Sequence, residues 1–388
     1  MPRPGNGRTP EIGIALLALL VLLPALAQPF SHDDLNSVYQ AALSWHRPAH
    51  LLDPWMGGLL RMVPKALLMG LVLVAGPHAW PYRLLNAGIT GLSVYLLVRT
   101  VSERSGSRPV GLWSGALFAA GFAWYAAAAI QISNITIVSA LLFLLAAWRL
   151  AQRGERLAAI ACFALAALCH EGAWAALLFL PFAMRSEIPP AFRYALAACL
   201  MLFGVGALLP GQPGTYCATE MQYWAFAIVP LNATLAGSQP FPGGLAHLAA
   251  GIVAMRPWAG FLALALLLAV SLRARGAAAA AVAWCLVFTL PFAAAITFWP
   301  EVWPAHWLSR RYLYVPAVGL CWLAALLIMA LRPIPRRVLA TLLLLWSLAW
   351  TGLTIWGAGR EAVSPAQVQA RADWAREMGT LDARWKTR

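Results

Sequence analysis

Apolar runs, most of them nearly long enough to cross a membrane as a helix, recur along this sequence, and short arginine-bearing segments separate many of them. A helix needs about 20 mainly apolar residues to cross the hydrocarbon core of a bilayer. Hydrophobic residues make up 61% of the 388 residues and charged residues only 11%, whereas soluble domains carry about 25% charged residues. The sequence therefore excludes a soluble globular domain, a disordered chain and a disulfide-rich secreted scaffold. It predicts an all-α integral membrane protein.

We predict one polytopic transmembrane domain over 1–388, a helical bundle of about eleven spans. The spans are predicted near 11–28, 83–100, 110–129, 134–150, 156–170, 171–184, 192–209, 258–272, 277–298, 312–331 and 336–357. Basic residues mark cytoplasmic ends. Most arginines outside the C-terminal tail then fall on one side, which we take as the cytoplasm, so the N-terminus is expected there. The membrane is expected to be a bacterial inner membrane. Ala25-Leu26-Ala27 also fits a signal-peptide cleavage site, so the first span has a second interpretation.

The net charge of +14 raises the question of nucleic-acid binding. The arginines stand singly or in pairs between apolar runs, and they form no dense basic stripe. They are typical of topology signals, so no nucleic-acid partner is expected. The six cysteines form no Cys-x-x-Cys pair, so the sequence gives no sign of a metal or redox framework.

Outward-facing interfacial segments are predicted in addition to the spans. In the first outer loop, 29–82, the apolar stretch 54–75 is interrupted by Arg61, Pro64 and Lys65, which favours a helix lying in the membrane interface. In the tail, 359–388, apolar residues recur at helical spacing, which favours an outer amphipathic helix. The lipid bilayer is therefore a partner of the whole chain.

Three polar clusters within or beside the spans require an explanation. His32, Asp33 and Asp34 directly follow the first span. An aspartate there can cap a helix. It can also act as a general base that takes a proton from an acceptor hydroxyl. A divalent metal is a further alternative, but three adjacent residues seldom supply a full coordination shell.

The second cluster, His170-Glu171, interrupts an apolar run with arginines at both ends. Both ends therefore favour the same side of the membrane, so we predict a hairpin of two short helices that turns at His170-Glu171. A charged residue at the centre of a membrane costs about 2.5–3.5 kcal/mol on insertion scales. The pair is interpreted either as a hydrogen bond that holds the hairpin or as part of a functional site.

The third cluster, Arg310, Arg311 and Tyr312, begins a span on the outer side and follows His306 in the tryptophan-rich segment 299–311. Arginines on this side run against the positive-inside tendency. They anchor the helix by snorkelling or, alternatively, bind an anion, because the guanidinium grips phosphate in two places. A phosphate at this level would belong to a lipid.

Five short motifs resemble the GT-C superfamily of polytopic glycosyltransferases. The closest likeness is to the protein O-mannosyltransferase-like branch, which includes the tetratricopeptide-associated mannosyltransferases. The motifs are Asp33-Asp34, Arg47-Pro48, the stretch from Gly76 to Asn86, His170-Glu171, and Arg311-Tyr312-Leu313-Tyr314-Val315-Pro316-Ala317-Val318-Gly319. Two departures stand out: an outer loop near Ala126 lacks the expected acid, and His170 replaces a lysine.

The resemblance implies a glycosyltransferase that uses a polyprenyl-phosphate sugar on the non-cytoplasmic side. Asp33, or less favourably Asp34, would be the general base on an acceptor hydroxyl of a glycan, lipid or protein, and the configuration would invert. Arg311 and Arg310 would stabilise the leaving phosphate. The other substrate-binding candidates are His32, Arg47, His170, Glu171, His306 and Tyr312. No cofactor is implied.

A structural membrane subunit without chemistry is one alternative, favoured by the missing acid near Ala126. Two other functions also remain open at this point. One is an O-antigen polymerase or ligase type of enzyme, which depends less on a carboxylate after the first span. The other is a non-enzymatic transporter of lipid-linked sugars. Transporters often contain inverted repeats, and the predicted hairpin at 156–184 has no visible counterpart in the other half of the sequence.

Overall fold

The computed structural model describes residues 9–30, 32–52, 61–76, 78–121, 131–177, 274–298 and 314–362, with isolated positions in the tail. Every regular element in these ranges is helical, which confirms the predicted all-α class. The elements are α1 (Thr9–Leu26), α2 (His32–His46), η1 (Pro48–Leu51), α3 (Met62–Ala75), α4 (Ala79–Ser105), α5 (Arg108–Ala119), η2 (Ile132–Asn134), α7 (Ile135–Gln152), α8 (Arg156–Ala167), η3 (Glu171–Ala175), α15 (Gly276–Phe298), α16 (Ala317–Ala330) and α17 (Pro333–Ala362).

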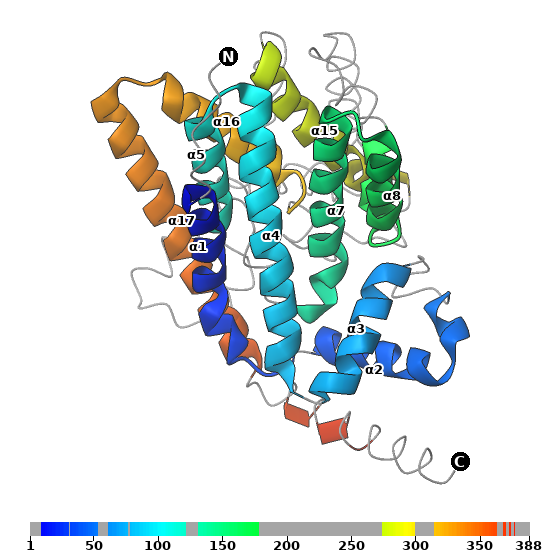
Figure 1. The fold of residues 1–388 in the computed structure, drawn as a ribbon. Helices are drawn as coiled ribbons and strands as arrows, with labels where there is room; N and C mark the ends of the chain where they lie inside the picture. The colour runs from blue at the N-terminus through cyan, green and yellow to red at the C-terminus, as the bar shows by residue number, and fades with distance from the viewer. Residues whose placement is uncertain are drawn as a thin grey trace, which may run out of the picture.

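Helix α4 is the axis of the described bundle (Figure 1). It packs against α1, α5 and α7, and α16 covers α5. At one end of α4, Arg83 contacts the carbonyl oxygen of Gln28, just after α1. Just beyond its other end, Arg108 contacts Glu11 near the start of α1, so α1 and α4 are antiparallel. The short helices α2 and α3 pack on each other beside the end of α4 that carries Arg83.

Three helical segments are long and apolar enough to cross a membrane: Thr9–Leu26, Ala79–Ser105 and Ile132–Gln152. They coincide with three of the predicted spans and support a membrane protein. The total of about eleven spans stays a prediction, because the spans near 192–209 and 258–272 lie outside the described residues. The span predicted over 110–129 begins as α5, whose helix ends earlier, at Ala119.

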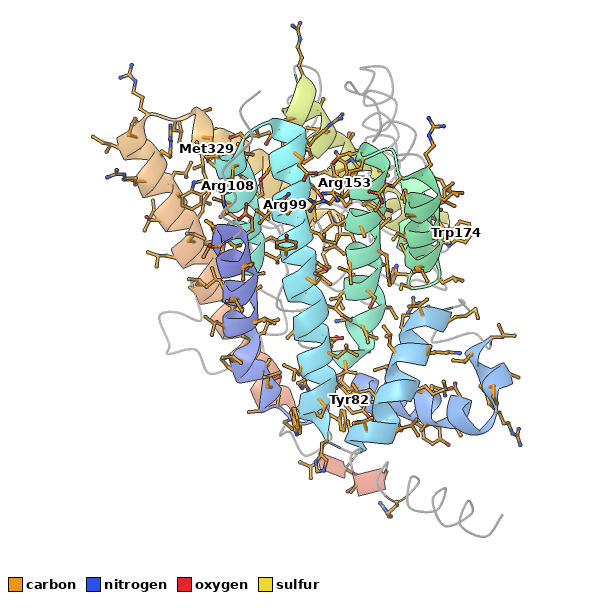
Figure 2. The ribbon with its side chains drawn as sticks, viewed as in Figure 1. Tyr82, Arg99, Arg108, Arg153, Trp174 and Met329 are labelled. Atoms are coloured by element: carbon orange, nitrogen blue, oxygen red, sulfur yellow. The ribbon has the colours of Figure 1, made fainter. Side chains whose placement is uncertain are left out.

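Many basic residues of the described helices gather at one end of the bundle, whereas Lys65 and Arg83 lie toward the other. Figure 2 shows Arg99, Arg108 and Arg153 toward this end and Tyr82 toward the opposite one. Ion pairs link the helices there: Glu11 to Arg108 at 2.9 Å and Glu103 to Arg149 at 2.8 Å. This geometry agrees with the side to which the sequence assigns these arginines, while the assignment of that side to the cytoplasm remains a prediction.

Close packing of α4 against α5 depends on glycine, and this gives a testable prediction. A Cβ at Gly111 would lie 2.5 Å from the carbonyl oxygen of Val98 and closer still to Ser102 Oγ. Gly111→Ala should therefore push the helices apart and destabilise the fold by about 1–3 kcal/mol or more. The matched variant Gly88→Ala meets no atom within 4 Å and should be neutral or slightly stabilising. Thermal unfolding of both variants in detergent checks this; equal melting temperatures would contradict the packing.

Candidate functional site

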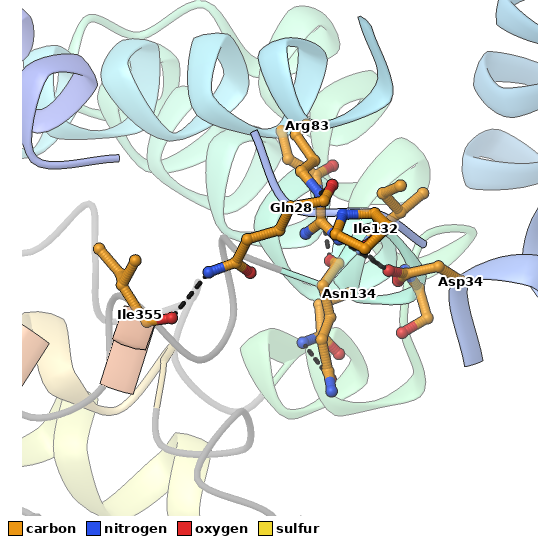
Figure 3. Close-up of polar contacts among 10 residues, drawn as sticks. Gln28, Asp34, Arg83, Ile132, Asn134 and Ile355 are labelled. Carbon is orange, nitrogen blue, oxygen red and sulfur yellow. Dashed lines mark hydrogen bonds and ion pairs between the residues drawn. The ribbon is translucent and has the colours of Figure 1, made fainter. Parts of the chain in front are cut away.

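The carboxylate of Asp34 lies at the centre of a buried polar cluster, in the first turn of α2 (Figure 3). Its side chain is fully buried. One oxygen, Oδ2, lies 3.3 Å from Arg83 Nη2. The other, Oδ1, accepts hydrogen bonds from the backbone N–H groups of Ile132 at 2.6 Å and Ser133 at 3.3 Å. An arginine and two backbone N–H donors thus contact both oxygens of this buried carboxylate.

Arg83 ties this cluster to the chain that follows α1. Its guanidinium donates to the carbonyl oxygens of Gln28 at 3.1 Å and Pro29 at 2.6 Å, in addition to its contact with Asp34. The side chain of Gln28 in turn donates to the carbonyl oxygen of Ile355 in α17 at 2.7 Å. We call the Asp34–Arg83 pair and its backbone partners the clasp. It joins α2, α4 and η2 with the segment after α1.

The clasp bears on one of the two interpretations of the aspartates, that one of them caps a helix. Asp34 lies inside α2, and its carboxylate accepts hydrogen bonds from the first two N–H groups of a distant element, η2. The preceding residues, His32 and Asp33, belong to the first turn of α2, and their side chains lie outside the described part. The catalytic role of either aspartate stays a prediction.

A line of polar residues continues from the clasp along the same face of α4. Arg83, Asn86 and Thr90 follow one another at helical spacings of 3 and 4 and are all buried. Asn86 Nδ2 donates to the carbonyl oxygen of Gln131 at 2.9 Å. Thr90 Oγ1 lies 3.4 Å from the hydroxyl of Tyr314, which belongs to the late arginine-tyrosine motif. The face of α4 that begins at the clasp therefore reaches that motif.

The segment 314–316 is held in place by α15. Trp284 Nε1 donates to the carbonyl oxygen of Val315 at 2.8 Å. Val315 also lines a small cavity of about 10 Å³, together with His170 and Phe288. A space of this size accommodates about one water molecule. The late motif and the His170-Glu171 motif thus meet at this cavity.

His170 is buried and fixed by its own backbone. α8 ends at Ala167, and η3 begins at Glu171, which confirms the break predicted at this point. Nδ1 of His170 accepts a hydrogen bond from the Gly172 N–H at 3.0 Å, so His170 is the N-cap of η3. The Leu168 carbonyl oxygen accepts a bond from the Val63 N–H at 3.4 Å, which joins the break to α3 of the first loop. Most of the second predicted helix, 171–184, lies outside the described residues.

The capping bond of His170 makes a prediction about stability. His170→Leu removes the acceptor and leaves the buried Gly172 N–H without it, so we expect a loss of about 0.5–2 kcal/mol. Asparagine is a good N-cap residue, and His170→Asn should recover much of this loss. Melting temperatures of the two variants in detergent test the difference. A His170→Leu protein as stable as the wild type would show that the cap contributes nothing.

Of the remaining predicted site residues, only Arg47 has a described side chain. Arg47 is exposed and directly precedes η1, and the described part gives it no direct contact with the clasp. His306, Arg310, Arg311 and Tyr312 lie outside the described residues, as does the side chain of Glu171. Sequence reasoning missed Arg83 as a site residue and treated it as a topology charge. An arginine predicted on the outer side runs against the positive-inside tendency, and this could have marked Arg83 as a site residue.

Comparison of the chain with known protein families, with curated proteins and with solved structures finds no match.

Proposed function

We propose that this protein is a multi-pass membrane glycosyltransferase that moves a sugar from a polyprenyl-phosphate donor to an acceptor hydroxyl on the non-cytoplasmic side. The observation that carries the proposal is the convergence of motif segments distant in sequence. The clasp joins Asp34 to Arg83, and the same face of α4 reaches Tyr314. Val315 then shares a cavity with His170.

In the proposed mechanism Asp33 is the general base. Its carboxylate takes the proton of the acceptor hydroxyl as the oxygen attacks the anomeric carbon. The new carbon–oxygen bond forms as the bond from the anomeric carbon to the phosphate oxygen breaks, so the configuration inverts. The bonding electrons leave with the lipid phosphate, and Arg310 and Arg311 stabilise its negative charge.

Asp34 has a different part in this scheme. Arg83 and two backbone N–H groups occupy its carboxylate, which suits a positioning group more than a base that must exchange protons. By fixing the first turn of α2, the clasp would hold Asp33 at a constant place relative to α4. Proximity and orientation of this kind contribute several kcal/mol to catalysis.

The experiment is a transfer assay in isolated membranes. Membranes that contain the protein receive radiolabelled polyprenyl-phosphate sugars, and matched membranes lack it. We expect label to move from the lipid to a glycan, lipid or protein acceptor only when the protein is present. Translocation of the labelled lipid without transfer would support the transporter and overturn the proposal.

A further inference from the structure

Two buried polar atoms beside the clasp have no hydrogen-bond partner among the described residues: Asn86 Oδ1 and Ser133 Oγ. Asn86 is fully buried, and Ser133 is 7% exposed. Buried polar atoms are almost always hydrogen-bonded, so an unpaired one calls for an explanation such as a water or a ligand. Two such atoms, one on α4 and one on η2 next to the clasp, leave hydrogen-bonding capacity that the described residues do not use.

The orientation of both groups is fixed by their neighbours. Asn86 Nδ2 donates to the Gln131 carbonyl oxygen at 2.9 Å, so its Oδ1 is the free acceptor. The backbone N–H of Ser133 donates to Asp34 Oδ1, which places the serine directly on the clasp. The side chain of Gln131 accepts from Asn134 Nδ2 at 3.2 Å. Asn86 of α4 thus bonds the residue that directly precedes η2, and Ser133 belongs to η2, so both side chains lie at the start of η2.

We infer that Asn86 and Ser133 form a sugar-binding subsite beside the clasp. This inference rests on the proposed function and names the part of the donor that the subsite holds: the hydroxyl groups of the transferred sugar. Asn86 Oδ1 accepts from one sugar hydroxyl, and Ser133 Oγ accepts or donates to a second. A few placed polar groups of this kind fix the orientation of a ligand. The subsite therefore sets which sugar the enzyme accepts.

The test measures binding, so it does not depend on turnover. The full-length protein in detergent is titrated with bare polyprenyl phosphate and with polyprenyl-phosphate glucose, mannose and arabinose. The affinity gained from the sugar is the ratio of two dissociation constants. For the wild type we expect at least one sugar-bearing lipid to bind about tenfold tighter than bare lipid, as expected for one or two well-placed hydrogen bonds.

Ser133→Ala is the main variant, because it removes an atom that has no partner in the described part and leaves the backbone bond to Asp34 intact. We expect it to lose most of the sugar-dependent gain while bare lipid binds as before. Asn86→Leu should do the same. Ser139→Ala is the matched control: its hydroxyl is also buried and unpaired among the described residues, but it lies in α7 away from the clasp. This control should bind like the wild type.

Two results would overturn the inference. One is a full sugar-dependent gain in Ser133→Ala and Asn86→Leu, which would mean that the free atoms hold only water. The other is a wild-type protein that binds all three sugar lipids no better than bare lipid. The proposed function fails separately: it is wrong if no sugar is transferred in membranes, even where the binding result holds.

Discussion

Asp33→Asn should abolish sugar transfer in membranes while the protein accumulates to its normal level. A general base contributes about 10²–10⁴-fold to a rate, and asparagine cannot take the proton. Asp33 lies in α2 directly before Asp34, and the substitution leaves all contacts of the clasp in place. The measurement is the initial rate of label transfer per amount of folded protein, compared with the wild type.

The control for this prediction removes a carboxylate elsewhere. Glu155→Gln changes an exposed residue between α7 and α8, near the end of the bundle that carries Arg153, and should leave the rate unchanged. Transfer that persists in Asp33→Asn would reject Asp33 as the base. Retained transfer would then favour the polymerase or ligase type of enzyme, which depends more on its outward arginines.

The sequence predicts the all-α membrane class well, because a helix that crosses a membrane needs a long apolar run. Each of the three span-length helical segments contains an apolar run that is visible in the printed sequence. The helix α2 was not predicted, since its sequence mixes polar and apolar residues and its mean hydrophobic character is low. Its helical face becomes apparent only when Leu35 and Val38 are seen packed with Leu68 of α3. That packing is a tertiary contact, and no local pattern encodes it.

The motifs singled out Asp34 and His170, and the structure places both in buried polar contacts, while their functional roles stay predictions. What sequence could not supply is the partner of each group. Arg83 lies 49 positions from Asp34, and η2 lies 98 positions from it. Long-range pairs of this kind depend on how α2 packs against α4. Residue spacing along the chain therefore cannot predict them.

Asp34→Asn should unfold or strongly destabilise the protein, whereas Asp33→Asn should not. Asp34 and Arg83 are 0% and 3% exposed, and removal of one partner leaves a buried charge without its counter-charge. The expected cost is about 3–5 kcal/mol. The comparison is Glu103→Gln: this carboxylate is 36% exposed and contacts Arg99, Arg149 and Arg153, and its loss should cost less than that of Asp34, about 0.2–1 kcal/mol for each pair. Melting temperatures in detergent compare the two.

A double variant separates the structural role of the clasp from a catalytic one. Asp34→Asn combined with Arg83→Met removes both charges, so the double variant should be less destabilised than the sum of the two single variants, by about 0.5–3 kcal/mol. If Asp34 were itself the base, Asp34→Asn would keep a normal melting temperature and lose transfer. That outcome would exchange the roles of the two aspartates. If Asp34→Asn is destabilised while Asp33→Asn is stable and inactive, then Asp34 has a structural role in the clasp and Asp33 is the general base.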